Sequence, residues 1–358
     1  MSSRIYQDSN KVKEDTISSR VLDFKSAKLA KKDEFYTQLE DIHAEIKHYS
    51  KSLEGKVVYL NCDDPRYSNF FRYFVDNFSK LKIKSVIASG YAINGKNDEL
   101  GNSLNSGIWA EYNGISEDNL SNLTGGISLN FFNGDGDFRS KESLELLERA
   151  DVIITNPPFS LFREYVSQVI ENKKEFLVLG NMNALTYKEV FPLFKDNLVR
   201  YGRSIRSGDR EFEVPYDYPL DAAITRIDEN GARFIRVKGV RWFTNMSIDE
   251  ELEYIPLVRS FSKDLYPTYV NFPAIEVGKT SDIPYDYDGL MGVPISFMDR
   301  YNPQQFEIIG SSKTLAKPMS EFTPVGTYQS GGPRFYLKNE DISFRRLYER
   351  IVIRNRLL

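Results

Sequence analysis

The chain has 358 residues but only one cysteine, Cys62, and two histidines, His43 and His48. A single cysteine cannot form a disulfide within the chain, so we expect a protein of the reducing cytoplasm. Zinc sites combine several Cys and His side chains, and this chain has few to offer. The sequence therefore predicts a protein without disulfides and without a required metal.

Long apolar runs and a basic excess are also missing. No stretch approaches the roughly 18 apolar residues of a membrane-spanning helix, and the N-terminus is polar and charged, unlike a signal peptide. We therefore expect no membrane partner. The formal net charge is −4, whereas strong nucleic-acid binders usually carry a basic excess. The net charge thus does not favour a nucleic-acid partner, but it leaves room for a locally basic cleft.

The most informative stretch is 150–160, Ala-Asp-Val-Ile-Ile-Thr-Asn-Pro-Pro-Phe-Ser. The β-branched run 152–155 is apolar without alternation, which predicts a fully buried strand. Two prolines end this strand because they can neither donate to a sheet nor extend a helix. Apolar residues then recur at helical spacing from Leu161 to Ile170. We expect Asn156 and Phe159 at the carboxyl edge of a central strand, where open α/β sheets bind ligands.

Further apolar runs alternate with helical patterns along the chain. The expected strands are 57–61, 84–88, 127–132 and 175–179. This alternation predicts an α/β fold with a doubly wound, mostly parallel sheet. The segment 90–126 is too long for a simple connection, so we expect a hairpin or a flap there. The runs 222–226, 234–237 and 240–243 are expected to be hairpin strands that close one edge of the sheet.

Composition divides the chain into three parts. Residues 1–30 are mostly polar and predict a mobile arm or a loosely docked helix. Residues 31–248 carry the alternating strand and helix pattern of a larger α/β domain. From 249 to 358 tyrosines and prolines are interleaved, which predicts a smaller, loop-rich domain. Its last segment, 345–356, alternates arginines with apolar residues; it suits an edge strand whose charges contact phosphates or, equally, prevent aggregation.

A polar turn, Cys62-Asp63-Asp64-Pro65, follows the first expected strand. Ser68 is placed to cap the next helix. The glycine-rich fingerprint that cradles a pyrophosphate is absent from this turn. The turn therefore favours a ligand without phosphates, held by Asp and Asn side chains.

The sequence Asn156-Pro157-Pro158-Phe159 has a specific chemical use at a strand end. The Asn156 side-chain oxygen and the Pro157 carbonyl are two acceptors in fixed geometry, since proline locks φ. Together they can accept both hydrogens of an exocyclic amino group and orient the nitrogen lone pair. Phe159 can stack on the ring that carries this amine. An ordinary Pro-Pro turn is the alternative, but it explains neither the Asn nor the aromatic residue in register with the strand and the helix.

These residues resemble the catalytic motif of amino methyltransferases that depend on S-adenosylmethionine and modify adenine N6. Further motifs in the same order resemble the EcoRI-type adenine-specific DNA methyltransferase family, from about Asp33 to near the C-terminus. These motifs are Phe35-Tyr36-Thr37-Gln38, Leu60 to Pro65 with Ser68-Asn69-Phe70, Gly136 to Ser140, Gly180 to Ala184, Arg241 to Asn245, Met291 to Pro294 and Tyr301-Asn302-Pro303. The resemblance implies a Rossmann-like methyltransferase fold with a C-terminal target-recognition region.

The resemblance also implies residue roles. The cofactor-binding residues would be Phe35, Tyr36, Thr37, Asn61, Asp63, Asp64, Asp137 and Phe138. Asp137 and Phe138 resemble the pair that holds the cofactor adenine by its amino group and its ring face. The catalytic residues would be Asn156, Pro157, Pro158 and Phe159.

The implied substrate is double-stranded DNA, from which the target adenine is flipped out. Phe159, with Trp242 or Phe243 opposite, would sandwich the base, and Arg345 and Arg346 would contact the DNA. We expect a monomer that protects DNA in a restriction-modification system, where a cognate endonuclease need not touch it, or acts as an orphan methylase. An RNA-base or protein-glutamine methyltransferase and a non-catalytic DNA-binding protein are the competing hypotheses.

Overall fold

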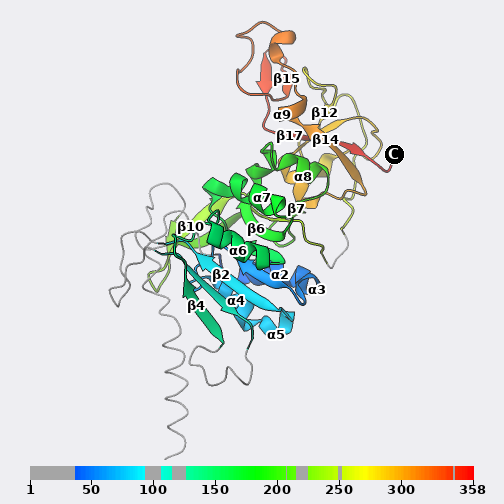
Figure 1. Ribbon diagram of the computed structural model, residues 1–358. Coiled ribbons are helices and arrows are strands. Elements are labelled where there is room, and N and C mark those ends of the chain that lie inside the picture. Colours follow the sequence, from blue (N-terminus) through cyan, green and yellow to red (C-terminus); the bar gives the residue numbers. More distant parts are fainter. Residues whose placement is uncertain are drawn as a thin grey trace, which may run out of the picture. The chain divides into compact units, whose positions relative to one another are not determined.

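A computed structural model describes residues 37–92, 106–114, 126–206, 208–214, 225–248, 252–341 and 343–358 (Figure 1). Phe35, Tyr36 and the predicted N-terminal arm lie outside these residues. The chain forms two compact units. Unit 1 comprises Met1–Asn181 and Gly202–Asp249, and unit 2 comprises Met182–Tyr201 and Glu250–Leu358.

The core of unit 1 is a sheet whose four central strands are parallel. In spatial order these strands are β2 (Ser85–Gly90), β1 (Val57–Leu60), β5 (Val152–Thr155) and β6 (Glu175–Asn181). Antiparallel strands flank them: β3 (Ile108–Tyr112) and β4 (Ile127–Phe131) beyond β2, and β11 (Val240–Thr244) beyond β6. All four residues of β5 are buried, as an apolar run without alternation predicts. The predicted α/β class with a mostly parallel central sheet is confirmed.

Helices cover both faces of this sheet. They are α2 (Leu39–Ile46), η1 (Lys47–Tyr49), α3 (Ser50–Leu53), α4 (Asn69–Asp76), α5 (Phe78–Leu81), α6 (Lys141–Arg149), η3 (Phe159–Leu161) and α7 (Phe162–Glu171). On one face, α2 and α4 pack with Val58 and Leu60 in a common core cluster. On the other face, the Tyr59 hydroxyl interacts with Ser143 of α6. Because neighbouring strand residues point to opposite faces, β1 is covered on both sides.

Serine side chains fix the starts of two of these helices. The Phe71 N–H donates to the Ser68 hydroxyl at 3.1 Å, which caps α4 as the sequence predicts. Ser140 caps α6 in the same way, since the Ser143 N–H donates to its hydroxyl at 3.2 Å. Such caps satisfy backbone donors that the first helical turn leaves without partners.

The predicted hairpin forms between Thr225–Ile227 and Arg233–Lys238, but it does not close an edge of the large sheet. Of the three predicted strands, only β11 joins that sheet. A separate antiparallel sheet has the order β8 (Asp209–Val214), β10 (Arg233–Lys238) and β9 (Thr225–Ile227). The partner strand β8 carries alternating charged and apolar residues, and the sequence analysis did not identify it. Residues 222–224 lie outside the described part of the chain.

Unit 2 has a small mixed sheet, short helices and many loops. Its sheet has the order β12 (Ile275–Glu276), β13 (Met291–Pro294), β17 (Arg350–Asn355) and β14 (Phe306–Ser311), and a hairpin joins β15 (Tyr336–Lys338) to β16 (Phe344–Arg346). The other elements are η4 (Met182–Thr186), α8 (Phe191–Lys195), β7 (Arg200–Tyr201), η5 (Thr280–Asp282), η6 (Ile295–Arg300), α9 (Ser312–Leu315) and η7 (Met319–Glu321). A second core cluster, which includes Tyr269, Phe335 and Val352, fills this unit.

The prediction that the C-terminal segment forms an edge strand is wrong. The segment forms two strands, β16 and β17, and β17 lies inside the sheet with β13 on one side and β14 on the other. Ile351, Val352 and Ile353 are fully buried there. Arg350 faces inward, where Glu276 neutralises it. The alternation of arginine with apolar residues therefore reflects buried ion pairing as well as solvent-exposed charge.

No helix in the described ranges is both long and apolar enough to cross a membrane.

Candidate active site at the carboxyl ends of the parallel strands

Asn156 lies directly after β5, at the carboxyl edge of the parallel strands. Its side chain is 8% exposed. Pro157 beside it is buried, while Pro158 and Phe159 are half-buried. Phe159 packs against the main core cluster and begins η3, which leads into α7. The two prolines thus hold an amide and an aromatic ring at fixed positions between a strand and a helix.

The Asn156 side chain is oriented by a threonine far away in the sequence. Its Nδ2 donates to the Thr37 hydroxyl at 3.3 Å, and both residues are buried. The Thr37 carbonyl accepts a hydrogen bond from Asn69 Nδ2 at 2.8 Å. The chain before α2, the first turn of α4 and the end of β5 are therefore tied together. With the amide nitrogen directed at Thr37, the Asn156 Oδ1 is the atom turned away from it.

Asp63 joins the ends of the two central strands. One carboxylate oxygen accepts from the Ser68 hydroxyl at 2.9 Å, and the other accepts from the Thr155 hydroxyl. Ser68 also caps α4, so the same few groups fix the turn after β1 and the residue before Asn156. These two hydrogen bonds fix the orientation of the Asp63 carboxylate.

The neighbouring residues Asn61 and Asp64 are buried and form further hydrogen bonds. The Asp64 carboxylate pairs with the Arg66 guanidinium at 2.8 and 3.0 Å. The Asn61 Oδ1 accepts from the Tyr165 hydroxyl, and burial raises the pKa of Tyr165 well above its usual range. A Cβ at Gly90, the last residue of β2, would lie 2.7 Å from the Asp64 Cα. Only glycine allows the ends of β1 and β2 to approach this closely.

The loop before α6 lies against the same strand ends. Gly136 has a positive φ of 76°, and a Cβ there would lie 2.8 Å from the Gly90 carbonyl oxygen. Asp137 follows and accepts from Arg139 at 2.7 and 2.8 Å, which lowers the pKa of its carboxyl. Phe138 is buried, edge-on to the Tyr165 ring at 5.2 Å between centroids. The turns after β1 and β5, the end of β2 and the loop before α6 therefore converge.

Trp242 and Phe243 lie elsewhere, within β11. Trp242 is fully buried and meets the Phe70 ring edge-on at 6.0 Å. Phe243 is also buried, 4.9 Å from the Phe162 ring. The structure places both rings in the packed interior, so neither is presented to a base at the surface.

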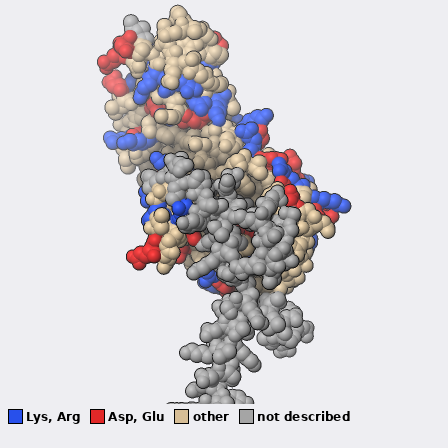
Figure 2. Space-filling view, turned by 90° about the vertical axis from the view of Figure 1, so that its left-hand side faces the viewer, with Lys and Arg blue, Asp and Glu red and all other residues tan. Residues whose placement is uncertain are grey.

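Arg345 and Arg346 belong to β16 in unit 2. Arg345 is exposed, whereas Arg346 donates to the Gly332 carbonyl at 3.0 Å. On the face drawn in Figure 2, Lys and Arg side chains gather over part of unit 2, with acidic groups at the margins. The C-terminal arginines thus lie in a different unit from Asn156.

Several residues of the strand-edge site were missed by sequence reasoning. Thr155, Asn69, Tyr165 and Arg139 hold the predicted residues in place through hydrogen bonds or ring contacts. Most of their partners are 30 or more positions away in the chain, and no local pattern reports such pairs. Across the described ranges, no cluster of three or more His, Cys, Asp or Glu side chains could hold a metal ion.

Comparison with known proteins identifies the class of enzyme. A family model described as adenine-specific methyltransferase EcoRI matches residues 23–356. The match starts before the motifs near Asp33 and so includes part of the predicted arm. The chain is also similar to Type II methyltransferase M.EcoRI of Escherichia coli, with 46% identity over 285 residues, or 79% of this chain and 87% of that protein.

Two further relatives come from mycoplasmas. Type II methyltransferase M.MgeORF184P of Mycoplasma genitalium is 33% identical over 343 residues, covering 92% of this chain and 98% of that protein. Type II methyltransferase M.MpnI of Mycoplasma pneumoniae is 33% identical over 342 residues, covering 93% of this chain and 98% of that protein. No solved structure matches significantly. The chain belongs to the EcoRI family of adenine-specific methyltransferases, so the predicted family and enzyme class are confirmed.

Proposed function

We propose that this enzyme methylates the N6 atom of adenine at a specific site in double-stranded DNA, with S-adenosylmethionine as the methyl donor. Family membership and the names of the Type II relatives support a role in restriction-modification or as an orphan methylase. In this proposal unit 1 contains the Rossmann-like catalytic domain, predicted as 31–248. Residues 249–358 contribute target recognition. The enzyme acts as a cytoplasmic monomer and needs no direct contact with a cognate endonuclease.

The observation that carries the proposal is the orientation of Asn156. Because its Nδ2 donates to Thr37, its Oδ1 points away from Thr37, and we assign this oxygen to accept from the substrate amino group. The Pro157 carbonyl offers a second acceptor on the same rigid segment. Two acceptors draw the amine hydrogens into one plane and turn the nitrogen lone pair toward an electrophile. The chemistry then depends on alignment and electrostatics rather than on a strong base.

Phe159 is the residue we assign to the base itself. Its ring is half-buried at the start of η3, next to the two prolines. A flipped base loses its stacking in the duplex, a cost of roughly a few kcal/mol that aromatic contact in the enzyme must offset. Since Trp242 and Phe243 are buried in β11, we assign no stacking role to them.

The strand-edge residues fit S-adenosylmethionine in their chemistry. The close contacts at Gly90 and Gly136 shape a backbone surface that side chains would fill. Asp137 remains 23% exposed, whereas Asp64 is 3% exposed and paired with Arg66. We therefore assign Asp137 and Phe138 to contact the adenosine part of the cofactor. The residues that give the cofactor site its shape are Thr37, Asn61, Asp63 and Asp64. When bound, the cofactor supplies a methyl group on a positively charged sulfur.

An assay with labelled S-adenosylmethionine tests the proposal. Duplex DNA, RNA and protein are offered separately, and the methylated product is digested and identified. We expect label in N6-methyladenine of duplex DNA at one sequence context. Label in RNA or in glutamine side chains would show that the enzyme methylates RNA or protein instead. Absence of cofactor binding in calorimetry would instead indicate a non-catalytic DNA-binding protein.

A further inference from the structure

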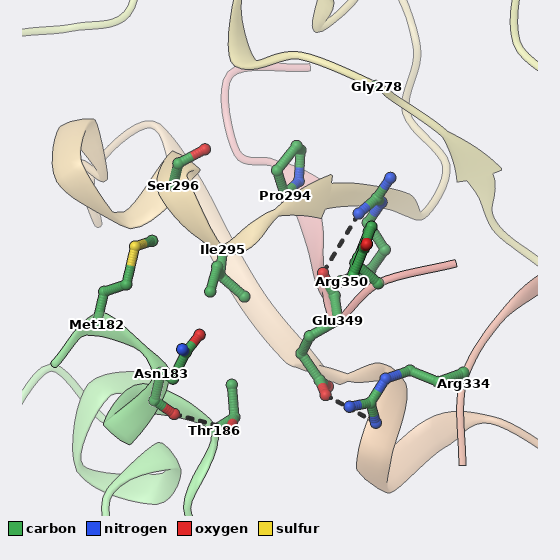
Figure 3. A pocket seen from close by; sticks show the side chains of 11 residues that line it. Met182, Asn183, Thr186, Gly278, Pro294, Ile295, Ser296, Arg334, Glu349 and Arg350 are labelled. Atoms are coloured by element: carbon green, nitrogen blue, oxygen red, sulfur yellow. Dashed lines mark hydrogen bonds and ion pairs between the residues drawn. The ribbon is translucent and has the colours of Figure 1, made fainter. Parts of the chain in front are cut away.

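Unit 2 contains a cavity of about 580 Å³ whose lining includes none of the residues described around Asn156. Residues of η4 lie on one side, and Arg334, Glu349 and Arg350 lie on the other (Figure 3). Ile295 and Ser296, at the start of η6, complete the wall shown there. Cavities of roughly 300–1,000 Å³ are typical of small-molecule sites, and one nucleotide fits within that range.

Tyr348 also lines this cavity, and its exposure is unusual. The residue is 89% exposed, the largest value among the bulky apolar side chains in the described residues. Leaving an aromatic ring in water forgoes the stabilisation that burial would give. A single exposed apolar residue on a mobile loop needs no explanation. Tyr348 differs because its backbone is held on both sides.

The residues next to Tyr348 are anchored by hydrogen bonds. The Leu347 N–H donates to the Phe335 carbonyl at 3.0 Å, and the Leu347 side chain is buried. The Glu349 carboxylate accepts from the Ser312 hydroxyl at 2.9 Å. The Arg350 N–H in turn donates to the Ser312 hydroxyl at 3.1 Å. The ring is thus presented to solvent from a fixed backbone between β16 and β17.

The charged side chains of the cavity are paired, and Arg334 is the cation through which the cavity can contact an anionic ligand. Its only acidic lining residue, Glu349, is occupied by Arg334 at 3.0 Å and by Ser312. Arg350 is neutralised from behind by Glu276, at 2.7 Å. Arg334 retains 21% exposure of its side chain, and the exposed Arg345 lies on the adjoining strand β16. An arginine beside an exposed aromatic ring suits a phosphodiester attached to a planar base.

We propose that this cavity binds one nucleotide of the DNA whose base lies outside the duplex stack, with Tyr348 stacked on the base and Arg334 beside its phosphate. The proposal rests on the DNA-methylating function proposed above. It adds a second site for unpaired DNA, formed by residues other than those around Asn156. Such a contact offsets part of the cost of opening the duplex around the target adenine.

Three tyrosine variants test the proposal. Tyr348→Ala removes the ring, Tyr348→Phe keeps it, and Tyr285→Ala removes a 50% exposed tyrosine of unit 2 that does not line the cavity. Duplex affinity is measured by fluorescence anisotropy, cofactor affinity by calorimetry, and methylation under single-turnover conditions. We expect Tyr348→Ala to weaken DNA binding about tenfold or more, as stacking losses do. Tyr348→Phe and Tyr285→Ala should bind DNA nearly as the wild type does, and no variant should alter cofactor affinity.

Photocrosslinking locates the contact. 5-Iodouracil is placed at successive positions of the duplex, and the crosslinked peptide is identified by mass spectrometry. We expect a crosslink to the peptide that contains Tyr348 from one or two adjacent positions, and its loss in Tyr348→Ala. Wild-type affinity of Tyr348→Ala with no such crosslink would overturn the proposal. A change in oligomeric state of Tyr348→Ala, seen by sedimentation, would assign the ring to a protein interface instead.

The two proposals fail in different ways. If the wild-type enzyme methylates no duplex DNA, the proposed function fails. If it methylates duplex DNA and Tyr348→Ala behaves as the wild type, only the nucleotide site in unit 2 fails.

Discussion

The surroundings of Asn156 in unit 1 and the contact between β12 and β17 in unit 2 hold their polar groups in different ways. Around Asn156 the donors are neutral groups: the Asn156 amide donates to the Thr37 hydroxyl, and the Thr155 hydroxyl donates to the Asp63 carboxylate. Between β12 and β17 the polar contact is instead an ion pair, Arg350 with Glu276, whose side chains are 12% and 11% exposed. Neutral networks can set the direction of one acceptor atom, whereas ion pairs fix backbone position. The difference fits the proposed roles, in which unit 1 orients the reacting amine and unit 2 contacts the DNA.

The largest effect on stability should come from breaking the buried ion pair of unit 2. Glu276 and Arg350 are 11% and 12% exposed, and Glu276 also accepts from Tyr269. Removing one partner of such a pair typically costs about 3–5 kcal/mol because the other charge stays buried. We expect Glu276→Ala to lower the urea midpoint strongly. Glu307→Ala is the matched control, since its pair with Arg354 in the same sheet is 3.9 Å apart and exposed; it should cost under about 1 kcal/mol. Equal costs for the two variants would remove the distinction between buried and exposed pairs in unit 2.

A smaller effect, confined to catalysis, is expected from Thr37. Thr37→Val removes the hydroxyl that accepts from Asn156, so the amide loses its preferred orientation. We expect kcat to fall about ten- to a hundredfold, the scale of misplaced catalytic groups, with KM for DNA and the melting temperature little changed. Thr37→Ser keeps the hydroxyl and should retain most of the activity. If Thr37→Ser and Thr37→Val lose the same activity, the hydroxyl does not orient Asn156.

The smallest effect concerns pH and Asp137. Hydrogen bonds from Arg139 lower the pKa of this carboxyl. Because the pKa of Asp137 is lower in the folded protein than in the unfolded chain, where it is about 4, the charged carboxylate stabilises the folded protein at pH values above about 4. This stabilisation is lost as the pH falls through the pKa of the folded protein. We expect Asp137→Asn to be less stable than the wild type at pH 7, by under about 1 kcal/mol because Arg139 is exposed.

The difference between wild type and Asp137→Asn should shrink in acid. Urea unfolding between pH 3 and 7 measures it, and Asp76→Asn, at a mostly exposed position, is the control. A difference that stays constant across this range would show that the Arg139 pair does not act through the charge of Asp137.

Local sequence patterns predicted the parts of the fold that depend on neighbours in the chain. Val152–Thr155 is buried throughout because its residues are apolar and β-branched, and Ser68 caps α4 because its hydroxyl reaches the first helical turn. Both features need only a few adjacent residues. The convergence of the strand-end loops was predictable as well, since parallel strands end at the same edge.

Features that depend on strand pairing were not predictable. The sequence of β17 suits an edge strand or an interior strand equally, and its partners β13 and β14 decide which it is. Trp242 looked available to a base because aromatic rings serve both cores and ligand sites. Its burial against Phe70 depends on the position of β11 beside β6. The roles of the site residues and the division into catalytic and recognition domains remain predictions.

The central claim is that Asn156 aligns the substrate amine without taking part in cofactor binding. The direct test is single-turnover methylation of duplex DNA by Asn156→Ala, together with calorimetry of S-adenosylmethionine. We predict that methylation falls by about 100- to 1,000-fold or more, as when a preorganised acceptor or donor is removed from a reacting centre. The cofactor should still bind measurably. Methylation at the wild-type rate by Asn156→Ala would contradict the account.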